Sequence, residues 1–216
     1  MNRTLATFVL CLCVASTASA QGSASGPGKL EIGGFPMGGT FFVGGDGKEE
    51  VNFNVYSTGA NLTYYLTPRA AIEGELGISI GWAQDITYKN AEVLSAQMPN
   101  VWDYFGNFVW FPNGAAGQRL PFYVTAGAGA VSLQSRQPTK QFGYDTATVG
   151  FETFLAENFG GGVKIFRGAS APDWGFRIDY RYLIVNANSD APAFFAKSKN
   201  RAGHRISFGI LYTSKR

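Results

Sequence analysis

Apolar and polar residues alternate one by one along much of this chain, and the clearest case is the segment Phe176–Ile184. One face of the segment carries five apolar or aromatic side chains, and the opposite face carries three charges within five residues. Strict alternation over this length predicts a β-strand with one apolar face. The pattern recurs elsewhere, with Gly, Asn and mutually compensating charges on the polar side. This combination is typical of a transmembrane β-barrel, apolar outside and polar inside.

Eight segments alternate in this way, and most are much longer than the roughly 5–6 residues usual in globular sheets. A tilted strand crosses a bilayer in about 9–11 residues. The connections alternate between short and long, and the long ones are expected at Gln84–Pro99, Gln134–Phe151 and Asn186–Asn200. Outer-membrane barrels have short periplasmic turns and long external loops, so both termini are expected in the periplasm. The predicted strands cover residues 30–43, 51–66, 71–83, 100–111, 120–133, 154–166, 176–184 and 201–213.

The start of the chain has the features of a secretory signal peptide. Arg3 supplies a positive charge, an apolar core follows, and Ala18-Ser19-Ala20 forms a cleavage site before Gln21. No later apolar run reaches the ~20 residues of a transmembrane helix. We therefore expect three parts: a signal peptide over 1–20, a flexible periplasmic leader over 21–29, and a barrel over 30–216.

Composition narrows the functions that the mature chain can have. Cys11 and Cys13 both lie in the signal peptide, which leaves no disulfide, thiol nucleophile or thiolate metal site. Without Arg3, 17 basic side chains face 15 acidic ones, too small an excess to indicate nucleic-acid binding. His204 is the single histidine, which excludes a multi-histidine metal site. No cofactor is predicted.

Five pieces of the mature chain carry a family resemblance: Leu30–Phe35, Tyr64–Arg69, Phe159–Lys164, Phe176–Tyr182 and the closing strand. In order and spacing they resemble the outer-membrane β-barrel superfamily that includes the OmpA membrane domain and OmpX. The resemblance implies an all-β, eight-stranded antiparallel transmembrane barrel in the outer membrane of a Gram-negative-type bacterium. It also implies insertion by the barrel assembly machinery. Family members commonly end on an aromatic residue, whereas four further residues follow Tyr212 here.

Charged side chains on the inward faces are the best-defined candidate site. Glu73 and Glu75 could be paired for acid–base catalysis. An eight-stranded barrel, however, encloses a space that side chains fill, and charges buried there must be paired or hydrated. We therefore expect a structural network, with a gated small-ion path as the alternative. The predicted members are Glu73, Glu75, Asp103, Lys164, Arg177, Asp179, Arg181 and Arg205.

Outward-facing residues suggest contacts with the membrane. In the last predicted strand His204 faces outward and Ser207 inward, so the two cannot form the Ser/His pair of a lipid A deacylase. The loop residues Lys197, Lys199 and Arg201 could contact lipopolysaccharide phosphates, or could simply be solvated. Aromatic rings favour the membrane interfaces, where we expect Trp82, Trp102, Tyr104, Trp110, Tyr182 and Tyr212.

The sequence thus predicts a small integral outer-membrane barrel with a structural, adhesion or surface-interaction role and no catalytic activity. The alternatives are a narrow pore, a lipid A-modifying surface enzyme, and a soluble periplasmic barrel of the lipocalin type. The last would require apolar side chains inside, against the charged faces at Glu73 and Arg177. The expected partners are outer-membrane lipids, lipopolysaccharide, the assembly machinery and an extracellular ligand at the long loops.

Overall fold

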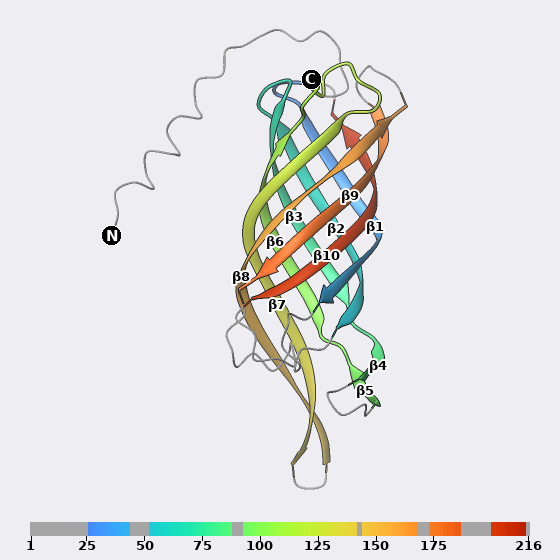
Figure 1. Cartoon of the computed structure of the whole chain (residues 1–216), viewed down its shortest axis with the longest axis vertical. Helices are drawn as coiled ribbons and strands as arrows, with labels where there is room; N and C mark the ends of the chain where they lie inside the picture. The colour runs from blue at the N-terminus through green and yellow to red at the C-terminus, as the bar shows by residue number, and fades with distance from the viewer. Residues whose placement is uncertain are drawn as a thin grey trace, which may run out of the picture.

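A computed structural model of the chain describes residues 26–43, 52–87, 93–141, 144–167, 173–186 and 200–214. Eight antiparallel strands form a closed barrel in the order β1-β10-β9-β8-β7-β6-β3-β2 (Figure 1). The first strand pairs with the last, so the barrel itself has no open edge. Among the described residues no helix is long and apolar enough to cross a membrane.

The barrel strands follow the predicted segments closely, because the alternation that predicted them places one face of each strand inside. Their bounds are β1 (Leu30–Val43), β2 (Phe53–Tyr65), β3 (Ala70–Ile80), β6 (Asn100–Trp110), β7 (Phe122–Gln141), β8 (Tyr144–Phe166), β9 (Asp173–Val185) and β10 (Arg201–Thr213).

Two of the expected long loops were wrong, because they contain strands. Gln84–Pro99 includes a small hairpin formed by β4 (Ala83–Thr87) and β5 (Val93–Gln97). Gln134–Phe151 is mostly a continuation of β7 and β8, which remain paired as far as Gln141 and Tyr144. Both hairpins project beyond the barrel and need no apolar face. Their strands therefore lack the alternation of apolar and polar residues from which the barrel strands are predicted. The third loop, Asn186–Asn200, lies almost wholly outside the described residues.

The barrel has two different ends. At one, called the turn end here, Leu66–Arg69 joins β2 to β3, and the first and last strands meet through Ser214 N–H and the carbonyl of Leu30 (2.9 Å). The connection after β6 folds back over this mouth, where Ala115 N–H donates to the carbonyl of Pro68 (2.7 Å) and Ala115 is fully buried. Gly114 provides a bend with φ of +77°, a conformation that glycine adopts without strain. The opposite end carries the β4–β5 and β7–β8 hairpins and is called the hairpin end (Figure 1).

Strand β1 contains a β-bulge at Pro36. Its pairing with β10 shifts between Gly34 and Met37, and its pairing with β2 shifts between Phe35 and Gly39. The side chains that face inward therefore change from odd to even positions along β1. Two hydroxyls of β2 satisfy backbone carbonyls there: Tyr56 donates to Pro36, and Thr58 donates to Phe35 at 2.7 Å. A bulge of this kind is compatible with proline, which cannot donate to the ladder.

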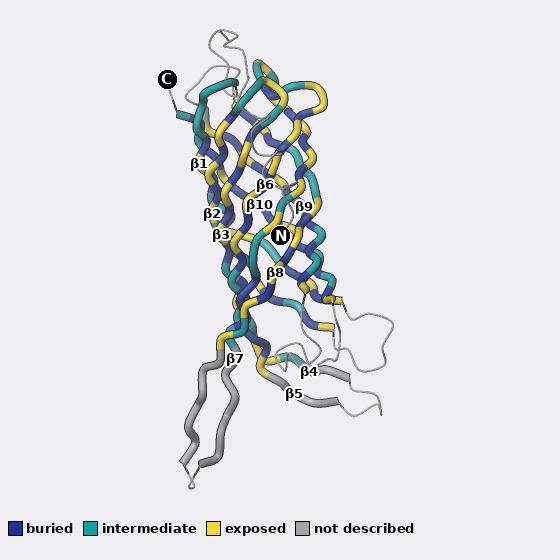
Figure 2. The backbone as a smooth tube through the Cα atoms, turned by 90° about the vertical axis from the view of Figure 1, so that its left-hand side faces the viewer, coloured by how far each residue is buried: buried dark blue, intermediate teal, exposed yellow. Residues whose placement is uncertain are grey.

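The barrel interior is layered, and it is not polar throughout as the sequence pattern predicts. Buried and exposed residues alternate along the barrel wall (Figure 2), and most of the buried charges lie in the middle of the interior. Towards the turn end the buried side chains are Tyr65, Ala71, Val109, Phe111, Ala115, Tyr123, Phe166 and Leu211. Towards the hairpin end they are Phe42, Phe53, Val55, Met98, Val101, Phe105, Val131, Leu133, Phe154, Ala156, Leu183 and Val185.

Candidate functional site: the charged barrel interior

All eight predicted interior charges face inward. Each is at most 7% exposed, because the strands put alternate residues on the inner face. They come from five strands: β3, β6, β8, β9 and β10. The structure brings them together as pairs across the barrel, between residues that can be more than 100 positions apart in the sequence.

Glu73 is the centre of the network. Its two carboxylate oxygens accept from Arg177 at 2.5 Å and from Arg181 at 2.9 Å. Asp179 lies between the same two arginines, accepting from Arg177 at 2.8 Å and from Arg181 at 2.6 Å. Two carboxylates and two guanidinium groups therefore neutralise each other, with geometry that favours strong, charge-assisted hydrogen bonds.

Arg205 forms a second group nearer the hairpin end. Its guanidinium donates to Glu75, and to Asp103 at 2.7 Å. Glu75 also lies 3.4 Å from Arg181, which joins this group to the central one. The seven charges form one continuous network.

Lys164 belongs to a separate pair near the turn end. Its ammonium lies 2.6 Å from Glu31, and the Tyr65 hydroxyl contacts both, donating to Glu31 at 2.8 Å and accepting from Lys164 at 3.0 Å. The rings of Tyr65 and Phe111 also face the ammonium, with centroids at 5.2 and 5.3 Å. Contacts of this kind compensate a buried cation for its lost hydration.

Neutral polar side chains complete the hydrogen bonds of the charged ones. The Tyr123 hydroxyl accepts from Arg177 Nε at 2.7 Å and donates to Asp179. The Asn158 side-chain oxygen accepts a hydrogen bond from Arg181 at 2.9 Å, and its nitrogen donates one to Asn107 at 2.8 Å. Hydrogen bonds of this number and strength make the buried charges tolerable.

Glycine in β8 gives the arginines room. A Cβ at Gly160 would overlap the carbonyl oxygen of Tyr180 and lie 2.9 Å from Cδ of Arg181. The glycine run in this strand therefore serves close packing between wall and interior, where a side chain could not fit.

Two further charges, Glu31 and Arg201, are fully buried and are not among the predicted interior charges. The signal was present, because Glu31 stands opposite the outward Ile32 and Arg201 shares the parity of Arg205. For Arg201 both predicted alternatives, contact with lipopolysaccharide and solvation in a loop, were wrong, since its guanidinium faces the Phe53 ring inside the barrel at 5.7 Å. Lys197 and Lys199 lie outside the described residues. With these additions, the buried charges of the described part are five acids and five bases.

The arrangement suits stability rather than chemistry. The described residues hold no group of three or more His, Cys, Asp or Glu side chains placed to bind a metal. Glu73 and Glu75 are both engaged by arginines and lie between the two apolar layers, where a substrate has no access. Their role in acid–base catalysis therefore has no geometric support.

Five of the six predicted interfacial aromatics lie towards the ends of the barrel wall. Trp110 pairs with Ala70 and Tyr212 pairs with Ile32 at the turn end, where Trp174 adds a ring 4.9 Å from that of Tyr212. Trp174 is not among the predicted interfacial aromatics. Towards the hairpin end lie Trp82, Trp102 and Tyr182. Tyr104 lies nearer the middle of the wall, where it pairs with Leu76 next to the central charges. Trp82 was predicted to lie within the strand over 71–83, but β3 ends at Ile80, so Trp82 follows the strand.

His204 lies on the outer surface, as its parity predicts. Its Nδ1 is 2.8 Å from the Tyr180 hydroxyl, and its ring packs edge-on to Tyr182 with centroids 5.2 Å apart. Ser207 is buried inside the barrel, 5% exposed. The wall of the barrel separates the two, so they cannot form a nucleophile–base pair.

Comparison with known proteins identifies the fold. No family model and no curated protein sequence matches the chain. Among solved structures, Neisserial surface protein A superposes with a TM-score of 0.58 over 87% of this chain and 98% of that one, at 10% identity. This chain has the fold of the small outer-membrane β-barrels. The N-terminal barrel domain of OprF from Pseudomonas aeruginosa also matches, with a TM-score of 0.49 and 13% identity over 88% of this chain and 99% of that chain.

Such a low identity carries the fold and nothing more. The eight-stranded antiparallel closure of the barrel agrees with the resemblance that the sequence motifs indicate. The role of this particular chain has to be argued from its own surfaces and interior.

Proposed function

We propose that this chain is an integral outer-membrane barrel with a structural, adhesion or surface-interaction role and no catalytic activity. The observation that carries the proposal is the outer face of the wall. Large apolar side chains there are broadly exposed, among them Ile72, Leu76, Phe122, Phe176 and Ile210 at 46–61%. An apolar surface that encircles a molecule would aggregate in water, whereas lipid covers it without cost.

The proposed orientation places the turn end in the periplasm and the hairpin end outside the cell. Short turns on the periplasmic side and longer excursions outside are the rule for such barrels. The β7–β8 hairpin, 20 and 23 residues in its two strands, extends furthest past the wall and is the natural surface for an external ligand (Figure 1). Outer-membrane lipids and lipopolysaccharide would contact the wall, and the barrel assembly machinery would insert it.

Cell fractionation tests this proposal directly. The mature chain should be recovered with the outer membrane, and the folded barrel should migrate differently on SDS gels before and after boiling. Protease added to intact cells should cut within the β7–β8 hairpin and leave the turn end intact. Recovery as a soluble periplasmic protein would contradict the proposal and favour the lipocalin-type alternative.

The pore alternative is weaker because the interior is filled. The charged network lies between two apolar layers, and every one of its charges has a partner of opposite sign within 3.5 Å. A hydrated ion path would have to displace Phe42, Phe53 and their neighbours at the hairpin end. The surface-enzyme alternative has less support still, given the separation of His204 from Ser207.

A further inference from the structure

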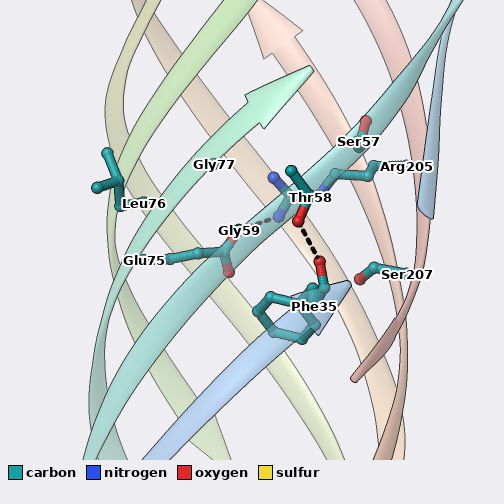
Figure 3. A pocket seen from close by; sticks show the side chains of 9 residues that line it. All are labelled: Phe35, Ser57, Thr58, Gly59, Glu75, Leu76, Gly77, Arg205 and Ser207. Carbon is teal, nitrogen blue, oxygen red and sulfur yellow. Dashed lines mark hydrogen bonds and ion pairs between the residues drawn. The ribbon is translucent and has the colours of Figure 1, made fainter. Parts of the chain in front are cut away.

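A small cavity lies inside the wall, next to the β-bulge of β1. Its lining includes Phe35 from β1, Ser57 from β2, Glu75 from β3, and Arg205 and Ser207 from β10 (Figure 3). The space open to water-sized spheres is about 10 Å³. A cavity needs on the order of 10–15 Å³ by this measure to hold one water molecule, so the space admits one small molecule at most.

One buried polar group at this cavity lacks a partner, and a serine hydroxyl lies beside the same space. Arg205 is 6% exposed, and its two terminal nitrogens are engaged by Glu75 and Asp103, but the buried Nε–H has no hydrogen bond. Ser207, which is 5% exposed, lines the same cavity and brings a hydroxyl group to it. Figure 3 shows Arg205 reaching across the cavity towards Glu75, with Ser207 beside the same space. Buried polar groups in proteins are normally paired, since an unpaired one costs about 1–3 kcal/mol.

The neighbouring hydroxyls do not supply the missing partner. Ser57 is held in a chain with Thr40 and Ser79, with both oxygen–oxygen distances at 2.6 Å. Thr58 donates to the Phe35 carbonyl at the bulge. The hydroxyls of Ser57 and Thr58 are therefore already engaged, and the Arg205 Nε–H is left without a partner beside the Ser207 hydroxyl.

We infer that this cavity is a binding site for one ordered water molecule. The water accepts a hydrogen bond from Arg205 Nε–H and either donates one to the Ser207 hydroxyl or accepts one from it. It can donate another to the Glu75 carboxylate beside it. Two to four polar partners are the usual number for a buried water. Bound in this way, the water would fill the gap that the bulge leaves in the wall and complete the bonding of Arg205.

The ligand is water rather than a small anion. A carboxylate lines the cavity, and the Arg205 charge is already neutralised by Glu75 and Asp103. An anion would therefore meet net repulsion in a space of low polarity. It would also have to lose its hydration to enter a volume sufficient for a single water.

Crystals of the parent barrel provide the first test. A structure at about 2 Å or better should contain a density peak within hydrogen-bonding distance of Arg205 Nε and Ser207 Oγ. Crystals soaked in bromide distinguish water from a halide, because bromide scatters anomalously. An empty cavity, or an anomalous peak at the site, would overturn the inference.

Solution NMR on the refolded barrel provides the second test. Water-to-amide cross-peaks of a long-lived water are expected at Gly59 and Gly77, which line the cavity. Ser207→Val fills the space with methyl groups and should abolish these cross-peaks. Ser207→Ala removes the hydroxyl but keeps the space, so the cross-peaks should persist. Their loss in Ser207→Ala would mean that the serine hydroxyl relayed them, and their persistence in Ser207→Val would place the water elsewhere. Either result contradicts the site.

Discussion

At the scale of single residues, the interior charges stabilise this barrel through complementarity. Arg177 illustrates the principle, with its guanidinium bonded to Glu73, Asp179 and Tyr123 and lying over the Phe35 ring at 5.2 Å. Removing such a cation leaves two carboxylates buried and undercompensated. The cost of losing a buried partner exceeds the net value of the pair, because desolvation of the remaining charges is no longer repaid.

Arg177→Ala should therefore lower the free energy of unfolding by about 3–5 kcal/mol, the range for breaking a buried ion pair. Urea titration of the protein folded in lipid vesicles measures this change from the midpoint and slope. Arg69→Ala is the matched control, because Arg69 is exposed at the β2–β3 turn and its loss should change the value by no more than about 0.5 kcal/mol. Equal midpoints for Arg177→Ala and the parent, at the same slope, would show that the network contributes nothing to stability.

At the scale of elements, each strand separates two environments, and the bulge in β1 shows how the separation survives an irregularity. Before the bulge Glu31 faces inward, and after it Thr40 and Phe42 face inward, although 31 is an odd position and 40 and 42 are even ones. One extra residue at Pro36 accounts for the change. Without that residue the two halves would continue in one regular register with their present partners in β2 and β10.

Deletion of Pro36 should therefore leave a folded barrel, because Met37 would still pair with Phe208 and Gly39 with Tyr56 in an unbroken ladder. Deletion of Thr40, outside the bulge, should prevent folding or strongly destabilise the barrel, since it turns Phe42 out of the interior. A one-residue shift exchanges the faces of every residue beyond it. The fraction with heat-modifiable gel mobility measures the difference. Equal folding of both deletions would contradict this assignment of the bulge.

The lipid-facing side of β9 permits a comparison of depth along one strand. Ile178 and Ile184 both face outward, but Ile184 lies one residue from the hairpin-end terminus of β9 and pairs with Glu157. An arginine on the lipid face costs about 2–4 kcal/mol at mid-bilayer and about 0–1 near the interface. Ile178→Arg should impair folding into liposomes, whereas Ile184→Arg should fold nearly as the parent does. Equal folding of the two variants would contradict a membrane position for this face.

At the scale of the whole molecule, the barrel is a closed wall around a filled core. The interior has an apolar layer towards each end and a network of seven charges between. The Lys164–Glu31 pair and Arg201 lie against the apolar layers, and the buried charges of the described residues are five acids and five bases in all. Eight strands enclose a space that side chains fill, whereas barrels of 16–18 strands leave a channel. The ring pairs at the two ends, such as Trp174 with Tyr212, lie where a membrane interface would hold them.

The filled interior predicts the absence of ion conduction. Planar bilayers containing the refolded barrel should show no current steps above the baseline, and a 16-stranded porin in the same bilayers serves as the positive control. Reproducible steps that disappear in Arg177→Ala or change their selectivity would support the small-ion path instead. The result separates the structural role from the pore alternative.

The alternation of apolar and polar residues by itself predicted the eight barrel strands and, apart from the part of β1 beyond its bulge, the face that their residues occupy. This information is local, because a strand exposes alternate side chains to opposite sides whatever it pairs with. It therefore placed Arg177 and Glu73 inside and Ile178 outside without knowledge of their neighbours. The same rule could have added Glu31 and Arg201.

Only the tertiary structure decided which inward residues meet. Glu73 reaches Arg177 across the barrel, 104 residues away in the chain, because the register of every intervening strand sets their relative height. The same registers collect Phe42, Phe53 and Leu183 into an apolar layer, although nothing local marks them as neighbours. The closed barrel thus decides which inward-facing side chains come into contact, and this outcome depends on the registers of all eight strands together.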